Sequence, residues 1–254
     1  MKMLDPIVFN LFGFSIRWYG IVYTLGFLFG YFFILHFSKY FKFDKNKIET
    51  IFLWTMIFSV LGGRLFYILF YNFDFYFSNP VKLLAVWEGG MSIHGGILGA
   101  FLSLSYFSKK YKINKYSLLD LFVLPASFML AIGRFANFVN QELVGKITDK
   151  GFGVVFPKID NFPRHPSVLY ESLNDFLIFQ VNLYLFFFQK LKAGTLTAIF
   201  LIWYNFGRFF IDFFRMPTID LGVISMGQLL CLIFGSYGIW MLIKIQKHSK
   251  IKTH

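Results

Sequence analysis

A stretch near the middle of the chain carries the residues best suited to chemistry. Residues 133–145 read Gly-Arg-Phe-Ala-Asn-Phe-Val-Asn-Gln-Glu-Leu-Val-Gly and follow a long apolar run. If the run is a helix that continues, a turn of about 100° per residue places Arg134, Asn137 and Gln141 on one polar stripe. A cation inside a lipid-compatible helix costs about 2.5–3.5 kcal/mol on insertion scales, so this arginine indicates a functional site. The alternative is a structural arginine bonded to carbonyl groups of neighbouring helices.

A second polar stripe interrupts a later apolar run. Tyr204, Arg208 and Asp212 recur every four residues, and Arg215 falls on the same face of a helix. The structural interpretation is an ion pair between Arg208 and Asp212, with Arg215 reaching out to the surface. The functional interpretation is anion binding, because arginine stays charged in dry surroundings and its planar group bonds phosphate oxygens in pairs.

A histidine among glycines is the third candidate. Residues 87–96 read Trp-Glu-Gly-Gly-Met-Ser-Ile-His-Gly-Gly, and Ser92 as an N-cap places His94 in the first turn of a helix. A glycine-flanked helix N-terminus favours anions, and the glycines leave space for a ligand. The ordinary pKa of histidine suits proton transfer near neutrality, so His94 is a candidate base, the alternative being a hydrogen-bonded spectator. Gly62 and Gly63, in the preceding apolar run, would let another backbone approach closely.

Composition predicts the class of protein. Of 254 residues, 57% are hydrophobic and 15% are charged, which is too little polar surface to cover a soluble globule. The net charge of +12 would suit nucleic acid, but no basic stretch resembles a nucleic-acid-binding module, so no such partner is expected. We predict one all-α polytopic integral membrane domain over residues 1–254, with seven transmembrane helices at about 19–37, 51–70, 91–107, 118–138, 168–188, 196–214 and 225–243.

The lysines predict the orientation of these helices. They gather in every second connection and after the last span, which places those segments in the cytoplasm, so the C-terminus is cytoplasmic and the N-terminus is outside. No cleavable signal peptide is visible, so the first span is expected to be retained. Residues 1–18 are expected to lie on the extracytoplasmic surface of the membrane before the first span. Residues 143–167, rich in proline and glycine, predict a small extracytoplasmic cap, with Ser167 as the next N-cap. The apolar residues near 152–156 are expected either to form a short strand or to dip into the membrane interface. The lysines are Lys39, Lys42, Lys45, Lys47, Lys109, Lys110, Lys112, Lys115, Lys190, Lys192, Lys244, Lys247, Lys250 and Lys252.

This orientation brings polar residues of five spans to one depth. Arg64, Arg134 and Arg208 fall in the outer halves of spans two, four and six, while Tyr19 and His94 begin spans one and three on the same side. The sequence therefore predicts an anion pocket in the outer half of the bilayer, where a phospholipid headgroup is the most available anion.

No metal, cofactor or enzyme nucleophile is expected. The histidines have no cysteine or carboxylate at ligand spacing. The single cysteine, Cys231, lies in the last apolar run, where a thiol is usually a small buried hydrophobe.

The central motif Gly133-Arg134-x-x-Asn137-Phe138-x-Asn140-x-Glu142-x-x-Gly145 is similar to the signature of the bacterial prolipoprotein diacylglyceryl transferases. The resemblance implies seven helices with the N-terminus outside, in the plasma (inner) membrane. It implies transfer of the diacylglyceryl group from phosphatidylglycerol to the lipobox cysteine in a preprolipoprotein signal peptide, with release of glycerol 1-phosphate. It extends through Arg17-Trp18-Tyr19-Gly20, Gly62-Gly63-Arg64, Gly89-Gly90-Met91-Ser92-x-His94-Gly95-Gly96, Arg164-His165-Pro166-Ser167-x-Leu169-Tyr170-Glu171, Tyr204-x-x-x-Arg208 and Ile224-Ser225-Met226-Gly227-Gln228.

The resemblance also implies roles for single residues. Arg134 resembles the family's phosphatidylglycerol-binding arginine, and Asn137 and Gly145 resemble other essential signature positions. Asp212 stands where the family often has glutamate, and the cap is shorter than in many members. A transporter or flippase for an anionic lipid or solute is the alternative function, but the internal repeat and interrupted helices that it would need are not visible. Residues matching positions linked to activity, and expected to be catalytic together with Arg134, are Tyr19, His94, Glu142, Tyr204 and Arg208. The expected substrate-binding residues are Arg134, Asn137, Gly145, Arg208 and Arg64.

Overall fold

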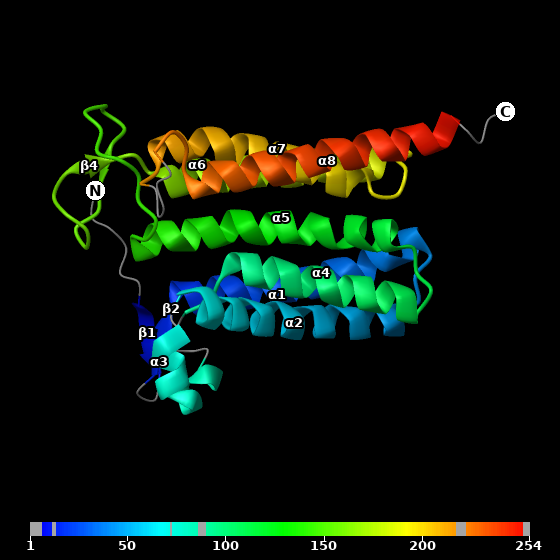
Figure 1. Ribbon diagram of the computed structural model, residues 1–254, viewed down its shortest axis with the longest axis horizontal. Coiled ribbons are helices and arrows are strands. Elements are labelled where there is room, and N and C mark those ends of the chain that lie inside the picture. The colour runs from blue at the N-terminus through cyan, green and yellow to red at the C-terminus, as the bar shows by residue number, and fades with distance from the viewer. Residues whose placement is uncertain (1–6, 12–13, 72, 86–89, 217–221, 251–254) are drawn as a thin grey trace. The chain divides into compact units, whose positions relative to one another are not determined.

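The computed structural model describes residues 7–11, 14–71, 73–85, 90–216 and 222–250, and most of these residues are helical (Figure 1). The prediction of a helical polytopic fold is confirmed. The longer helices are α1 (Trp18–Phe37), α2 (Lys45–Tyr71), α4 (Ile93–Lys110), α5 (Lys115–Asn140), α6 (Ser167–Phe188), α7 (Thr195–Ile211) and α8 (Met226–Lys250). The short elements are β1 (Ile7–Leu11), β2 (Phe14–Arg17), η1 (Ser38–Phe41), α3 (Phe73–Ser78), η2 (Pro80–Leu84), β3 (Val154–Val155), β4 (Pro163–Arg164) and η4 (Asp212–Phe214).

Within the described residues, five helices are long and apolar enough to cross a membrane. Each predicted span coincides with a helix, with ends that differ by a few residues. The two helices outside the set of five are α4, which is rich in glycine and serine, and α6, which carries acidic and amide side chains. Seven spans and their orientation therefore stay predictions. The five candidate spans are Gly20–Phe41, Lys45–Phe70, Lys115–Asn140, Thr195–Phe214 and Met226–Lys247.

The chain divides into two compact units, one formed by residues 33–121 and the other by residues 1–32 with 122–254. In the unit of residues 33–121, α2 and α4 lie side by side with glycines at their contact (Figure 1). A Cβ atom on Gly62 would meet the carbonyl oxygen of Gly95, and a Cβ atom on Gly99 would meet that of Phe58. The predicted close approach at Gly62 is confirmed. The interpretation that the glycines beside His94 leave space for a ligand is wrong for Gly95, because the backbone of α2 fills that space.

In the other unit, α6, α7 and α8 follow one another side by side (Figure 1). Three aromatic rings join α1, α5 and α6: the ring centroid of Phe128 lies 4.5 Å from that of Phe29 and 5.2 Å from that of Phe179. The α5–α6 contact also has a polar component, since the Ser172 hydroxyl donates a hydrogen bond of 2.7 Å to the Ala131 carbonyl. These contacts fix the helices that carry the candidate site.

The predicted cap forms between α5 and α6. Its strands β3 and β4 are antiparallel, which confirms the short strand expected near residues 152–156. Buried apolar side chains fill its base, namely Phe138, Val144, Phe156 and Val168. Ser167 is the first residue of α6 and Pro166 is the N-cap, so the predicted N-cap is wrong by one position. The Ser167 hydroxyl instead donates to the Leu143 carbonyl at 3.2 Å.

Two further details differ from the sequence-based expectations or refine them. Strands β1 and β2 pair in antiparallel orientation, and no strand was predicted in this part of the chain. Ser92 is the N-cap of α4 as predicted, with extended backbone, but its side chain makes no capping hydrogen bond.

Candidate active site

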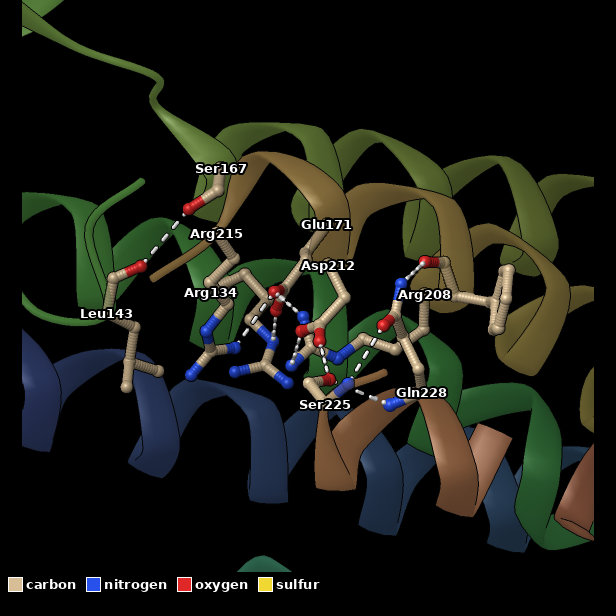
Figure 2. A network of polar contacts seen from close by, with 10 residues as sticks. Arg134, Leu143, Ser167, Glu171, Arg208, Asp212, Arg215, Ser225 and Gln228 are labelled. Atoms are coloured by element: carbon tan, nitrogen blue, oxygen red, sulfur yellow. Dashed lines mark hydrogen bonds and ion pairs between the residues drawn. The ribbon is translucent and has the colours of Figure 1, made fainter. Parts of the chain in front are cut away.

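Glu171 is the centre of a buried cluster of charged side chains. It lies on α6 with 3% of its surface exposed, and three arginines contact its carboxylate (Figure 2). Arg134 Nε lies 2.7 Å from Oε2, Arg215 Nη1 lies 3.0 Å from Oε1, and Arg208 Nη1 contacts the same Oε1 atom. The arginines come from α5, from α7 and from the residue after η4. A carboxylate this deeply buried requires opposite charges, so Glu171 and the arginines stabilise one another in a fixed arrangement.

Arg134 has two partners within the cluster. The side chain contacts Glu171 through Nε, and the Tyr204 hydroxyl is a further hydrogen-bond partner. These partners hold the side chain beside Glu171, and a planar guanidinium group is a fork that can bind two phosphate oxygens.

Arg208 is held from two sides. Its Nη2 atom lies 3.0 Å from Oδ1 of Asp212, one turn further along, so the predicted ion pair is confirmed. Asp212 in turn accepts a hydrogen bond from the Ser225 hydroxyl. Ser225 and Gln228 form a capping box at the start of α8, in which each side chain bonds the other's backbone N–H at 3.0 Å. The first turn of α8 is therefore tied to Arg208 through Asp212 (Figure 2).

Arg215 corrects a sequence-based interpretation. The structural interpretation of the second polar stripe had Arg215 reaching out to the surface, but the residue is 8% exposed and pairs with Glu171. Its backbone also forms an antiparallel bridge with Gly145, so it lies against the base of the cap.

The end of the central motif forms a tight turn rather than a continued helix. Helix α5 ends at Asn140, and Gln141 and Leu143 both have left-handed backbone, with φ of 61° and 55°. The expectation that Gln141 extends the helical stripe is therefore wrong. The turn presents Glu142, whose carboxylate accepts hydrogen bonds from the side-chain amides of Asn137 at 2.9 Å and Asn140 at 3.3 Å. Left-handed backbone is costly for such residues, so the turn is held by its surroundings.

Gly145 is required by a close approach of three backbone segments. Its N–H donates to the His165 carbonyl at 3.0 Å, and its own carbonyl accepts a hydrogen bond of 3.0 Å from Arg164 Nη1. A Cβ atom on Gly145 would collide with the His165 carbonyl oxygen and lie 2.7 Å from that of Phe214. The structure thus gives Gly145 a role in positioning the cap, and direct substrate binding by this residue stays a prediction.

Arg64 belongs to the other compact unit and is bonded to backbone carbonyls. Its Nε and Nη1 atoms donate to Leu83 and Gly90 at 3.1 Å each, and Nη2 donates to Lys82 at 2.6 Å and Ala85 at 3.0 Å. Its guanidinium carbon also lies 4.8 Å from the centroid of the Tyr76 ring. These contacts match the structural alternative stated for a buried arginine, and its place in the substrate-binding set stays a prediction.

The structure brings together some of the expected residues and leaves others untested. Arg134, Tyr204 and Arg208 converge in one unit, as expected. Tyr19 and His94 occupy the first turns of α1 and α4, but their side chains lie outside the described part of the structure. Their assigned roles, and the common depth of all five spans, stay predictions.

Sequence reasoning missed Glu171 as the centre of the cluster, and Asp175 beside it. Asp175, one turn after Glu171, is 1% exposed and lines a narrow pocket with Glu171, Asn174, Tyr204, Arg208 and Ile211. Charge balance was the available signal, because several buried arginines require a buried carboxylate, and α6 carries two in its N-terminal half. Among the described residues, no group of three or more His, Cys, Asp or Glu side chains is placed to hold a metal ion.

Fold and site together define a class: helical membrane proteins with a buried cluster of arginines around a carboxylate. The family model described as prolipoprotein diacylglyceryl transferase matches residues 6–244, and the chain belongs to this family.

Named relatives agree with this assignment along nearly the whole chain. A protein of Ehrlichia ruminantium (strain Welgevonden) is 43% identical over 248 residues, covering 94% of this chain and 96% of that protein. A protein of Rickettsia typhi is 42% identical over 246 residues, with coverage of 92% and 95%. A protein of Ehrlichia canis is 41% identical over 261 residues, with coverage of 98% and 100%. Each is named phosphatidylglycerol–prolipoprotein diacylglyceryl transferase.

Proposed function

We propose that this chain transfers the diacylglyceryl group of phosphatidylglycerol to the thiol of the lipobox cysteine in a preprolipoprotein signal peptide. The peptide thiol loses its proton, and its sulfur bonds to the glyceryl carbon. The bond from that carbon to the phosphate oxygen breaks, and glycerol 1-phosphate leaves. The observation that carries the proposal is the buried cluster of Arg134, Arg208 and Arg215 around Glu171.

The arginines stabilise the leaving group. Arg134 binds the phosphodiester through its terminal nitrogens, while the contact of its Nε with Glu171 keeps the fork in place. Arg208, held by Glu171 and Asp212, adds positive charge beside it. Negative charge grows on the phosphate as the bond to carbon breaks. Preorganised donors in a dry site stabilise this larger charge in the transition state more strongly than they stabilise the single charge of the bound phosphodiester.

The remaining assigned residues act around this centre. Tyr204 orients Arg134 through its hydroxyl. Glu142, fixed by Asn137 and Asn140, presents a carboxylate just after the C-terminal end of α5. His94 is the candidate base for the thiol, since neutral imidazole accepts a proton near neutral pH.

We further propose that all seven long helices span the bacterial plasma membrane, with the site in the outer half of the bilayer. Helix α4 has 18 residues and α6 has 22, so they are about 27 Å and 33 Å long, close to the thickness of the hydrocarbon core. Each has a reason for its lower hydropathy. The glycines of α4 pack against α2, and the acidic side chains of α6 face the protein interior.

One experiment tests the reaction directly. Purified protein is incubated with phosphatidylglycerol and a lipobox peptide, and with a matched peptide in which serine replaces the cysteine. We expect a diacylglyceryl thioether on the first peptide, an equal amount of glycerol 1-phosphate, and neither with the serine peptide. Lipid movement between leaflets without any thioether would favour the alternative, a transporter or flippase.

A further inference from the structure

The mechanism above leaves one buried carboxyl group of the site unused. Asp175 is 1% exposed, and its Oδ2 atom has no hydrogen-bond partner among the described residues. An ionised carboxylate in such a place is costly unless a partner satisfies it. Asp175 also stands four residues after Glu171 on the same face of α6, so it belongs to the arginine site by position.

The surroundings of Asp175 connect it to the anion site. Its carboxyl group interacts electrostatically with charged groups on three helices, namely Arg134 on α5, Glu171 on α6 and Arg208 on α7, and also with Asn174 on α6. Asp175 in turn interacts electrostatically with the Tyr204 hydroxyl. The Asn174 side chain is a hydrogen-bond partner. Glu171, Asn174, Asp175, Tyr204 and Arg208 line one narrow pocket. The charge on Asp175 therefore acts directly on the groups proposed to hold the phosphodiester.

The charges of the cluster cancel when every group is ionised. Three guanidinium groups, of Arg134, Arg208 and Arg215, face three carboxyl groups, of Glu171, Asp175 and Asp212. A bound phosphodiester adds one negative charge to a site with little water to screen it. Protonation of one carboxyl group restores neutrality.

Asp175 is the carboxyl group that can be protonated at least cost. Protonation of Glu171 would weaken its contacts with three arginines, and protonation of Asp212 would weaken its contacts with Arg208 and Ser225. Protonation at Oδ2 of Asp175 breaks no hydrogen bond within the described structure. It also removes a negative charge that would otherwise repel the phosphate.

We propose that Asp175 is the proton-binding group of the lipid site: it takes up one proton from solvent when the phosphodiester binds, and it sets how lipid affinity depends on pH. The inference rests on the proposed function, which supplies the anion. Since the bound state holds one proton more than the free state, affinity falls as pH rises, by up to about tenfold per pH unit.

The test measures the dissociation constant of the detergent-purified protein for phosphatidylglycerol, without peptide, between about pH 5.5 and 8.5. Without a thiol no transfer occurs, and the phosphodiester keeps its single charge throughout. The variant is Asp175→Asn, which keeps the shape of the neutral acid. The matched control is Asn182→Leu, because Asn182 is 0% exposed on α6, its amide atoms also lack a described partner, and it does not line the pocket.

We expect the dissociation constant of the parent and of Asn182→Leu to rise with pH, and that of Asp175→Asn to stay low and flat. The inference is overturned if folded Asp175→Asn shows the parent's pH dependence, or if it binds the lipid poorly at every pH. A second measurement needs no variant: in weak buffer near neutral pH, the parent should take up a proton on binding phosphatidylglycerol. Absence of uptake between about pH 5.5 and 8.5 overturns the inference.

The two proposals fail in different ways. A parent protein that transfers the diacylglyceryl group but takes up no proton keeps the proposed function and loses the role of Asp175. A parent protein that binds the lipid with proton uptake but forms no thioether on the lipobox peptide loses the proposed transfer reaction and keeps the proton-binding role of Asp175.

Discussion

The substitution Arg134→Lys separates charge from geometry at the proposed phosphate site. Arginine offers Nε to Glu171 at 2.7 Å and keeps two terminal nitrogens for the phosphodiester. The lysine side chain of the variant has the same charge but a single nitrogen, which cannot hold Glu171 and also bind two phosphate oxygens.

The size of the loss follows from the contacts. Whichever anion the ammonium group binds, about two charge-assisted hydrogen bonds are lost relative to arginine, each worth about 1.5–3 kcal/mol. The sum of about 3–6 kcal/mol corresponds to a fall in kcat/KM of about 10²- to 10⁴-fold. The Arg134 side chain is only 15% exposed, so water does not replace the lost bonds.

The assay is the initial rate of thioether formation at varied phosphatidylglycerol, with thermal unfolding measured alongside. Arg164→Lys is the comparator, because Arg164 is also a buried arginine paired with an acid, Asp160, but lies in the cap. We expect Arg164→Lys to lower the unfolding temperature while keeping most of the transfer rate. A rate for Arg134→Lys within about threefold of the parent would refute the proposed phosphate fork.

Four further predictions concern other parts of the chain. Cys231→Ala should keep nearly full transfer activity, because the attacking sulfur belongs to the peptide; loss of activity, or an adduct on Cys231, would contradict this. His94→Asn should lower turnover most at neutral pH and recover toward the ordinary thiol pKa of about 8.5, whereas an equal deficit at every pH would exclude His94 as the base. The hydrogen bond from Arg164 lowers the pKa of Asp160, so this carboxylate stabilises the fold at neutral pH and the gain is lost in acid. Asp160→Asn should therefore lower the unfolding temperature more at pH 7 than in acid below the ordinary aspartate pKa of about 3.9, and an equal drop at both would contradict the ion-pair account. Gly95→Ala should destabilise the α2–α4 contact by about 1–3 kcal/mol, and an unchanged unfolding temperature would show that the backbones can separate.

The sequence predicted those features that depend on local periodicity. Long apolar runs marked the helices within a few residues, and four-residue spacing identified the ion pair between Arg208 and Asp212. The pairing of Gly62 with a close backbone also followed from local sequence, because glycine pairs in apolar runs favour such contacts.

The features that the sequence did not reveal depend on which helices become neighbours. Glu171 lies near the start of α6, where an acidic residue ordinarily complements the helix dipole, so its sequence position does not indicate three arginine contacts from elsewhere. The glycines beside His94 were interpreted as space for a ligand, because the sequence does not show that α2 fills that space. The structural interpretation that placed Arg215 at the surface failed for the same reason, since its partner lies 44 positions away.

The glycine contact between α2 and α4 has a mechanical consequence. The helix backbones touch at Gly62, Gly95 and Gly99, so few side chains lie between the two helices. The helices therefore cannot slide past one another by a change of side-chain rotamers. The buried hydroxyls of Thr55 and Ser103, 3.1 Å apart, add a further link along the same contact. We therefore expect α2 and α4 to move together as one rigid body within their unit.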